Sequence, residues 1–214
     1  MKIKLCGFTD QESINFTLKY QPDFMGFIFY PPSKRNTTLS KAKKFSQINF
    51  GKTKKIAVIV DAKDNKIVKI IENLKPDLLQ LHGQEDATRC KDIKNKFNLP
   101  IIKSIAISNA SNKKEIQSYI DQYQKIANFL LFDAQTSEKG GSGLSFDWKI
   151  LQNLNLKENY FLSGGLNIDN FLKAAEISGS NLFDLSSGIE ESKGIKSLNK
   201  IRNLMIFFNE FKQT

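Results

Sequence analysis

The sequence of 214 residues predicts an α/β protein, a single-domain (β/α)8 TIM barrel over residues 1–214. Eight short runs rich in β-branched and aromatic residues recur along the chain, and their starts lie about 20 to 32 residues apart. Between most of these runs the apolar residues have helical spacing. No linker, low-complexity tract or change in composition divides the chain. Strands that alternate with helices favour a parallel sheet, and eight such units favour its closure into a barrel.

The expected strands are, in chain order, residues 3–6, 24–29, 55–60, 78–82, 100–105, 128–133, 160–164 and 181–185. Helical spacing of apolar residues is clearest at residues 67–74, 116–123 and 198–208. Thr9 and Glu12 fit a capping box that opens the first helix. An open doubly wound sheet is the alternative architecture, but its usual G-x-G-x-x-G motif is missing after the first strand.

The composition argues against several classes of protein. The net charge of +10 comes from 32 basic residues against 22 acidic ones, and only Arg35, Arg89 and Arg202 are arginine. Lysines spread along the chain favour solvated helix surfaces and an anionic small ligand over a nucleic-acid-binding surface. No apolar run is long enough for a membrane span, and the N-terminus lacks the apolar region of a signal peptide. Two cysteines indicate no disulfide framework, and one histidine fits no common zinc spacing. We therefore expect a cytoplasmic protein with reduced cysteines, no metal, and no membrane or nucleic-acid partner.

The first expected strand ends in residues that can carry chemistry. Lys4 and Cys6 share one of its faces and Ile3 and Leu5 the other, because side chains alternate along a strand. The apolar pair suits packing against helices, so we expect Lys4 and Cys6 to point into the barrel. Gly7 would then let the chain turn without covering the cysteine.

The same alternation places Gln80, His82 and Asp133 inside the barrel, on the fourth and sixth strands. These positions are late in their strands, and (β/α)8 enzymes have their active sites at the C-terminal strand ends. Each side chain also has a purely structural explanation. Cys6 could be a core residue, His82 a hydrogen-bonded core group, and Asp133 the cap of the next helix. Their convergence at one end of the barrel favours a catalytic site.

The loops after the seventh and eighth expected strands contain small residues, in the stretches SGGLNIDN (163–170) and SSGIEESKG (186–194). Glycine lets backbone N–H groups approach an anion closely. In many barrels, the loops after strands seven and eight hold a phosphate. The predicted phosphate-binding residues are Gly164, Gly165, Ser187 and Gly188. The stretch at 134–145, after the sixth strand, is expected to be a mobile loop.

Seven stretches together resemble the phosphoribosylanthranilate isomerase family, in its order and at its spacing. They are IKLCGFTD (3–10), FMGFIFYPPSKR (24–35), LLQLHGQED (78–86), LLFDA (130–134), GGSGLSFDW (140–148), FLSGGL (161–166) and DLSSGIE (184–190). The resemblance implies a (β/α)8 enzyme of tryptophan biosynthesis that uses no metal or organic cofactor. Such an enzyme converts N-(5-phosphoribosyl)anthranilate to 1-(2-carboxyphenylamino)-1-deoxyribulose 5-phosphate by an Amadori rearrangement.

Carried over position by position, the resemblance implies that Cys6 is the general base and Asp133 the general acid. It implies that Arg35 meets the anthranilate carboxylate of the substrate. The phosphate loops of the family match Gly164, Gly165, Ser187 and Gly188, and further substrate-binding residues are expected at Lys4, His82 and Asp184. Since Lys4 lies two residues before Cys6 on the same face, we also expect it to favour the thiolate.

The chain departs from the family pattern at Lys34 and Asn36, on either side of Arg35. It also departs at Leu144, in the loop after the sixth strand, where the family usually has a polar or basic residue. Neither departure removes a residue to which the resemblance assigns a chemical role. The second bears on how that loop closes.

Three alternatives remain open at this point. The histidine-pathway isomerase performs the same rearrangement on a barrel, but it has an aspartate where this chain has Cys6. Indoleglycerol-phosphate synthase, another phosphate-binding barrel, relies on catalytic lysine and glutamate at strand ends. A basic barrel that binds nucleic acid without catalysis would be retained on DNA in a salt-sensitive manner. The oligomeric state stays open between a monomer and a homodimer.

Overall fold

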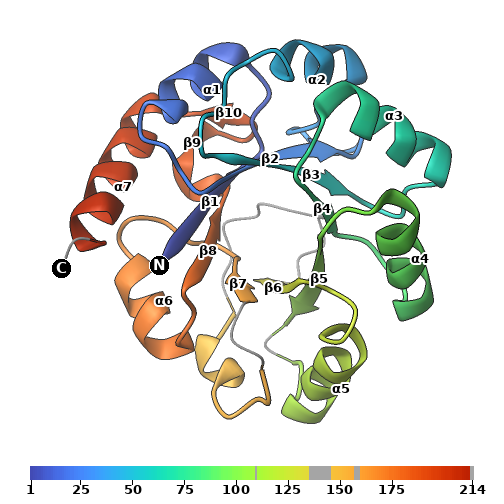
Figure 1. Cartoon of the computed structure of the whole chain (residues 1–214). Helices are drawn as coiled ribbons and strands as arrows, with labels where there is room; N and C mark the ends of the chain where they lie inside the picture. Colours follow the sequence, from blue (N-terminus) through green and yellow to red (C-terminus); the bar gives the residue numbers. More distant parts are fainter. Residues whose placement is uncertain (109, 135–145, 157–159, 213–214) are drawn as a thin grey trace.

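The structure is a computed structural model that describes residues 1–108, 110–134, 146–156 and 160–212. Eight parallel strands form a closed barrel in chain order, with β8 paired to β1, and helices surround it (Figure 1). The strands are β1 Lys2–Cys6, β2 Phe24–Phe29, β3 Lys54–Ile59, β4 Leu78–Leu81, β5 Ile101–Ile107, β6 Phe129–Ala134, β7 Tyr160–Leu162 and β8 Leu182–Leu185. The predicted (β/α)8 barrel is confirmed, and the open doubly wound sheet is wrong.

The described helices lie outside the barrel (Figure 1). They are α1 Gln11–Leu18, α2 Leu39–Phe45, α3 Asp64–Leu74, α4 Ala87–Phe97, α5 Lys113–Tyr123, α6 Phe171–Ser178 and α7 Leu198–Phe211, with short 3₁₀ helices η1 Trp148–Leu151 and η2 Ser187–Ile189. A small antiparallel hairpin of β9 Glu190–Ser192 and β10 Ile195–Lys196 stands between β8 and α7. In the described part of the chain, no helix has the length and apolar character needed to cross a membrane.

All eight predicted runs are strands, and their bounds differ from the expected ones by two residues or fewer. The seventh strand is two residues shorter than predicted. Gly164 and Gly165 follow it with φ of 90° and 67°, in the left-handed region, and this backbone geometry ends the strand.

The predicted capping box at Thr9 and Glu12 is wrong. Helix α1 begins one residue later than that box requires, and its N-cap is Asp10, whose Oδ1 accepts a hydrogen bond of 2.8 Å from the Ser13 N–H. An aspartate carboxylate is a good N-cap, and its charge is favoured at the positive end of a helix. The carbonyl of Thr9 instead accepts a hydrogen bond from the Lys41 ammonium.

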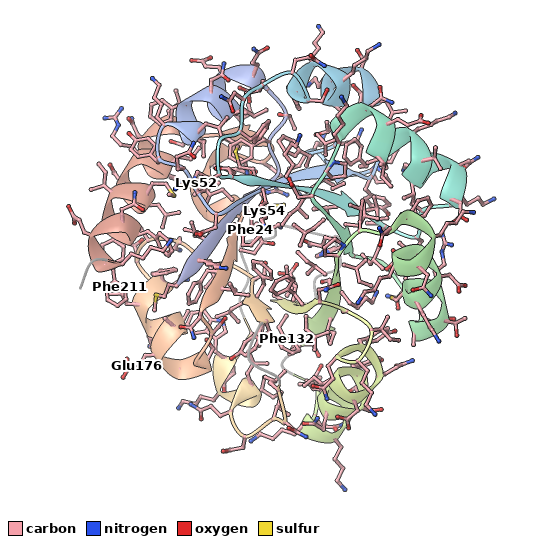
Figure 2. The ribbon with its side chains drawn as sticks, in the orientation of Figure 1. Phe24, Lys52, Lys54, Phe132, Glu176 and Phe211 are labelled. Carbon is pink, nitrogen blue, oxygen red and sulfur yellow. The ribbon has the colours of Figure 1, made fainter. Side chains whose placement is uncertain are left out.

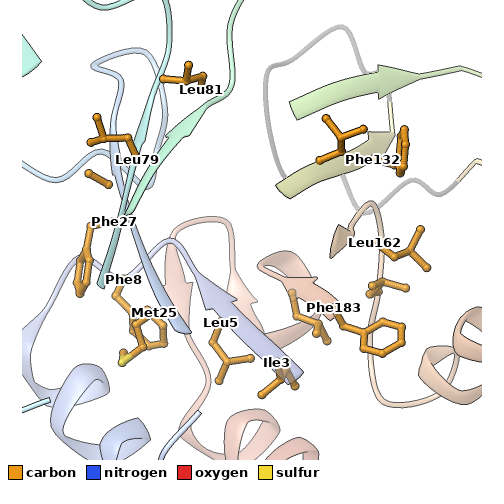
Figure 3. Close-up of a cluster of buried hydrophobic side chains, with 14 of the residues drawn as sticks. Ile3, Leu5, Phe8, Met25, Phe27, Leu79, Leu81, Phe132, Leu162 and Phe183 are labelled. Atoms are coloured by element: carbon orange, nitrogen blue, oxygen red, sulfur yellow. The ribbon is translucent and has the colours of Figure 1, made fainter. Parts of the chain in front are cut away.

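Two apolar layers share the strands, as the alternation of side chains predicts. The outer layer fills the space between barrel and helices, and it includes Ile3, Leu5, Leu79, Phe132 and Phe183 (Figure 3). The inner layer fills the barrel itself and is formed by Cys6, Phe24, Ile56, Val58, Leu78, Ile102, Leu131, Phe161 and Leu182. Lys4 and Cys6 therefore face the interior, as expected from the sequence.

Aromatic rings close the N-terminal end of the barrel. Phe24 lies inside the barrel (Figure 2). Its ring meets that of Phe161 edge-on, with 5.5 Å between the ring centroids. Phe129 packs on the other side of Phe161 at 5.6 Å. Phe24 and Phe129 are the first residues of β2 and β6. This end is therefore apolar, and polar chemistry is restricted to the C-terminal strand ends.

Candidate active site

Cys6 points into the barrel from the last position of β1, and a glycine on the next strand makes room for it. Cys6 is in register with Gly26 of β2. A Cβ atom at Gly26 would lie 2.5 Å from Cys6 Sγ and 3.2 Å from Lys4 Cε. Gly26 was not among the predicted site residues, although a glycine inside a strand is a known sign that another group approaches closely.

A buried ion pair crosses from β1 to β8. Lys4 Nζ donates to Asp184 Oδ2 at 2.6 Å, and the two side chains are 0% and 8% exposed. Burial, the largest single effect, lowers the pKa of Lys4, but Asp184 and Cys6 together outweigh it and raise that pKa. Lys4 is therefore charged. The second oxygen of Asp184, Oδ1, is buried and has no hydrogen-bond partner among the described residues.

Burial raises the pKa of the Cys6 thiol above its ordinary value. Lys4 acts in the opposite direction, as we expected, but its effect is smaller, and Asp184 adds a negative charge that supports the protonated form. The expectation that Lys4 favours the thiolate is therefore correct in direction, but burial outweighs this effect and Cys6 remains a thiol in the substrate-free protein. The physical reason is that the ammonium charge is paired with Asp184 inside a desolvated site.

Gln80, His82 and Asp133 form a chain of side chains at the barrel mouth, as predicted from strand alternation. Gln80 Nε2 lies 3.1 Å from His82 Nδ1, and His82 Nε2 lies 3.5 Å from Asp133 Oδ2. Because the Gln80 amide nitrogen can only donate, the neutral imidazole carries its proton on Nε2, facing Asp133. Gln80 itself was not among the predicted site residues. Its Oε1 is buried and has no hydrogen-bond partner within the described part of the chain.

The Asp133 side chain has one backbone partner among the described residues. Its Oδ1 accepts a hydrogen bond from the adjacent Ala134 N–H at 3.0 Å, and the next described helical segment, η1, is capped by Asp147. The Asp133 side chain is 17% exposed and that of His82 18%, whereas Cys6 is 5% exposed. The carboxyl group of Asp133 is therefore accessible at the barrel mouth, and the alternative of Asp133 as a cap falls on residues 135–145, which lie outside the described residues.

The two predicted catalytic residues face the mouth from different sides. Cys6 ends β1, and Asp133 lies on β6, with β7 and β8 between these strands on the shorter path around the barrel (Figure 1). His82 follows β4 and contacts Asp133, so it belongs to the Asp133 side. A substrate that occupies the mouth can thus receive a proton on one side and lose one on the other.

Arg35 lies in the loop after β2, and its side chain runs over Gly7 toward the mouth. Gly7 has a φ of 87°, as the predicted turn requires, and a Cβ there would lie 2.7 Å from Arg35 Cδ. The guanidinium is 2% exposed and pairs with Glu190 through two parallel bonds, Nε to Oε1 at 2.7 Å and Nη2 to Oε2 at 2.5 Å. Glu190 was part of a family-like stretch in the sequence, but no role was predicted for it.

The two predicted phosphate loops pack against each other. A Cβ atom at Gly188 would collide with the carbonyl oxygen of Leu166, so the loop after β8 touches the loop after β7 at a position that requires glycine. The carbonyl of Gly165 accepts a hydrogen bond of 2.9 Å from Asn170 Nδ2. The N–H groups of Gly164 and Gly165 donate no hydrogen bond within the described residues. Unpaired N–H groups in such a loop are suited to an anion.

Parts of the sequence prediction fall where the structure is not described. Residues 135–145, with Leu144 and most of the expected mobile loop, lie outside the described residues. Within the described ranges, no three His, Cys, Asp or Glu side chains gather in a way that could hold a metal ion.

The chain is similar in sequence and in structure to proteins of one isomerase family. The family described as N-(5'phosphoribosyl)anthranilate (PRA) isomerase matches residues 3–206. An N-(5'-phosphoribosyl)anthranilate isomerase from Bradyrhizobium sp. (strain ORS 278) is 37% identical over 207 residues, which cover 95% of this chain and 93% of that protein. The phosphoribosyl anthranilate isomerase of Thermotoga maritima has a similar structure, with a TM-score of 0.85, 29% identity and 99% of each chain covered.

A second similar structure contains a ligand. It is a phosphoribosyl anthranilate isomerase in complex with reduced 1-(o-carboxyphenylamino)-1-deoxyribulose 5-phosphate. Its TM-score is 0.81 at 26% identity, and 96% of each chain is covered.

Proposed function

Because this chain belongs to the N-(5'-phosphoribosyl)anthranilate isomerase family, we propose that Cys6 and Asp133 are the general base and general acid of its reaction. The enzyme converts N-(5-phosphoribosyl)anthranilate to 1-(2-carboxyphenylamino)-1-deoxyribulose 5-phosphate in tryptophan biosynthesis. The observation that carries this function is the 37% identity to a named isomerase over 95% of the chain. This match also decides against the two other barrel enzymes considered from the sequence.

Complementation tests the function. The chain should restore growth without tryptophan to a bacterial strain that lacks this isomerase, and the Cys6→Ser variant should not. Growth restored by neither protein, with both present in soluble form, would contradict the assignment.

The first chemical step opens the ribose ring. Asp133 gives a proton to the ring oxygen while the bond from C1′ to that oxygen breaks, and the anthranilate nitrogen donates its lone pair to form a C=N bond. The product is an open-chain Schiff base with a positive charge on nitrogen. A carboxylic acid at the accessible Asp133 position is suited to this step, and the neighbouring His82 orients its carboxyl group.

The second step removes the proton from C2′. Cys6 Sγ takes this proton, and the C–H electrons move toward the cationic nitrogen to give an enolamine, which tautomerises to the ketone. Cys6 is a thiol in the free enzyme, because burial raises its pKa. The cationic Schiff base favours the thiolate, because a positive charge beside a thiol lowers its pKa, and the thiol proton passes to solvent at the barrel mouth before Sγ takes the C2′ proton. The base is thus generated when the intermediate that needs it is present.

The remaining predicted residues bind the substrate in this proposal. Asp184 offers its unpartnered Oδ1 to a substrate hydroxyl while Lys4 holds the other oxygen. A buried acceptor without a partner is costly, so a donor from the ligand stabilises it. The location in the cytoplasm and the choice between monomer and homodimer remain predictions.

The Arg35→Ala variant should have a KM higher by about 10- to 100-fold, because a charge-assisted bidentate contact contributes about 1.5–3 kcal/mol. Steady-state kinetics measure this effect, and kcat should change much less. Arg35→Lys should recover only part of the loss, since an ammonium lacks the forked geometry. Thermal melts are needed as a control, because Arg35 also pairs with buried Glu190. An unchanged KM in a folded Arg35→Ala protein would remove Arg35 from the binding site.

Inorganic phosphate should compete with the substrate, and Gly165→Leu should weaken phosphate binding about tenfold or more by blocking backbone donors. Gly179→Leu is a matched control, because Gly179 has a similar φ of 70° against 67° and has no atom within 4 Å of its Cβ position. Both variants carry the same backbone strain, but Gly179 ends helix α6, away from the anion loops. Equal phosphate affinity in the two variants, measured by calorimetry, would show that the loops do not bind the anion.

A further inference from the structure

The hairpin of β9 and β10 reaches from β8 to the loop that carries Arg35. Its turn contains Gly194, whose φ is 90°, and a Cβ there would lie 2.7 Å from the carbonyl oxygen of Lys34. The turn therefore packs directly on the residue before Arg35. The hairpin also supplies two buried charged side chains, Glu190 and Lys196, which are 5% and 7% exposed.

Glu190 binds both cations of this region. One carboxylate oxygen, Oε1, accepts from Arg35 Nε at 2.7 Å and from Lys196 Nζ at 2.9 Å. The other, Oε2, accepts from Arg35 Nη2 at 2.5 Å. The Lys200 ammonium holds the Glu190 backbone carbonyl at 2.8 Å. The carboxylate thus fixes the plane of the guanidinium, which a forked contact with a second carboxylate requires.

Arg35, Glu190 and Lys196 form a buried charged cluster, in which Lys196 is the second cation beside Arg35. Glu190 alone would neutralise Arg35, and a neutral buried pair attracts a carboxylate only weakly. Among the described side chains, the Glu190 carboxylate and the two cations that bind it, Arg35 and Lys196, carry a net charge of one positive unit. Hydrogen bonds from Arg35 and Lys196 outweigh the effect of burial and lower the pKa of Glu190, so the carboxylate is charged at neutral pH.

The cluster is attached to the Cys6 end of β1. Lys196 Nζ donates to the Ser186 carbonyl at 3.2 Å, and Ser186 Oγ donates to the Cys6 carbonyl at 3.1 Å. The Arg35 stem lies against Gly7, the next residue. A carboxylate bound here is therefore held beside the residue that removes the C2′ proton.

We propose that Glu190 is a positioning residue that orients Arg35, and that Lys196 supplies the net positive charge with which this cluster binds the aromatic carboxylate of the substrate. The proposal rests on the proposed function, because it takes Arg35 as the residue that meets this carboxylate. It assigns to the hairpin a role in substrate specificity, in addition to its place in the fold.

The test compares two unreactive ligands by calorimetry. One is the reduced product, 1-(2-carboxyphenylamino)-1-deoxyribitol 5-phosphate, and the other is the same compound without the carboxylate. Glu190→Gln should lower the affinity for the first ligand about tenfold and change the affinity for the second by no more than about twofold. Lys196→Met should show the same selectivity, and it provides a second variant if Glu190→Gln does not fold. In turnover assays, both variants should raise KM more than they lower kcat.

The control is Glu191→Gln, which removes the exposed neighbouring carboxylate and should change neither ligand's affinity. An equal loss of affinity for the two ligands in the Glu190 and Lys196 variants would indicate a merely structural role and overturn the proposal. Unchanged affinity for both ligands would also overturn it. The Arg35→Ala variant distinguishes a failure of the roles proposed for Glu190 and Lys196 from a failure of the role proposed for Arg35. If it abolishes the preference for the carboxylate while the hairpin variants keep it, only the further inference fails. If Arg35→Ala also keeps the preference, the proposed role of Arg35 fails.

Discussion

Replacing Cys6 by serine is expected to lower kcat by about 10³- to 10⁴-fold, the upper part of the range for loss of one acid or base. Serine keeps nearly the same shape and fits the space that Gly26 leaves for the cysteine. A thiol has a pKa of about 8.5 in model peptides, whereas a hydroxyl is a far weaker acid. The cationic intermediate can generate a thiolate but not an alkoxide, so proton removal from C2′ becomes very slow.

The matched control for this variant is Cys90→Ser. Cys90 is the other buried cysteine of the chain, on helix α4 outside the barrel, and its substitution should leave kcat nearly unchanged. Thermal melts of both variants show whether the fold is retained. A well-folded Cys6→Ser enzyme with most of its kcat would make Cys6 an ordinary core residue. His82 would then be the next candidate base, although it lies on the side of Asp133.

The Asp133→Asn variant should lose kcat by a comparable factor, about 10²- to 10⁴-fold, because an amide cannot deliver a proton to the ring oxygen. Asparagine keeps the side-chain oxygen that accepts from the Ala134 N–H, so local geometry is retained. Asp92→Asn, at an exposed position of helix α4, is the matched control and should have full activity. If the folded Asp133→Asn enzyme turns over at the wild-type rate, another group supplies the proton, and His82 is the nearest candidate.

The barrel and the inward-facing residues could be predicted because they depend on local patterns. Each strand of a parallel barrel is a short apolar run, and two-residue alternation decides which side chains enter the interior. Lys4, Cys6 and Asp133 followed from this rule together with the position of each strand end. The N-cap at Asp10 was missed because two adjacent residues, Thr9 and Asp10, both have capping side chains. The position of a helix start is weakly specified in such cases.

The contacts between distant segments could not be predicted in the same way. Arg35 and Glu190 are separated by 155 positions, and only the closed barrel brings the two loops together. The protonation state of Cys6 depends on the balance between burial and the Lys4–Asp184 pair. A sequence names the charges but not the extent of their desolvation, and here desolvation decides the direction of the pKa shift.

The kinetic isotope effect on kcat, measured with substrate deuterated at C2′, tests the central assignment of base and acid most directly. Proton removal should limit turnover in Cys6→Ser, so its isotope effect should be at least as large as that of the wild-type enzyme. Ring opening should limit turnover in Asp133→Asn, so its isotope effect should fall close to one. An effect close to one in Cys6→Ser, together with a large effect in Asp133→Asn, would contradict the assignment of Cys6 as base and Asp133 as acid.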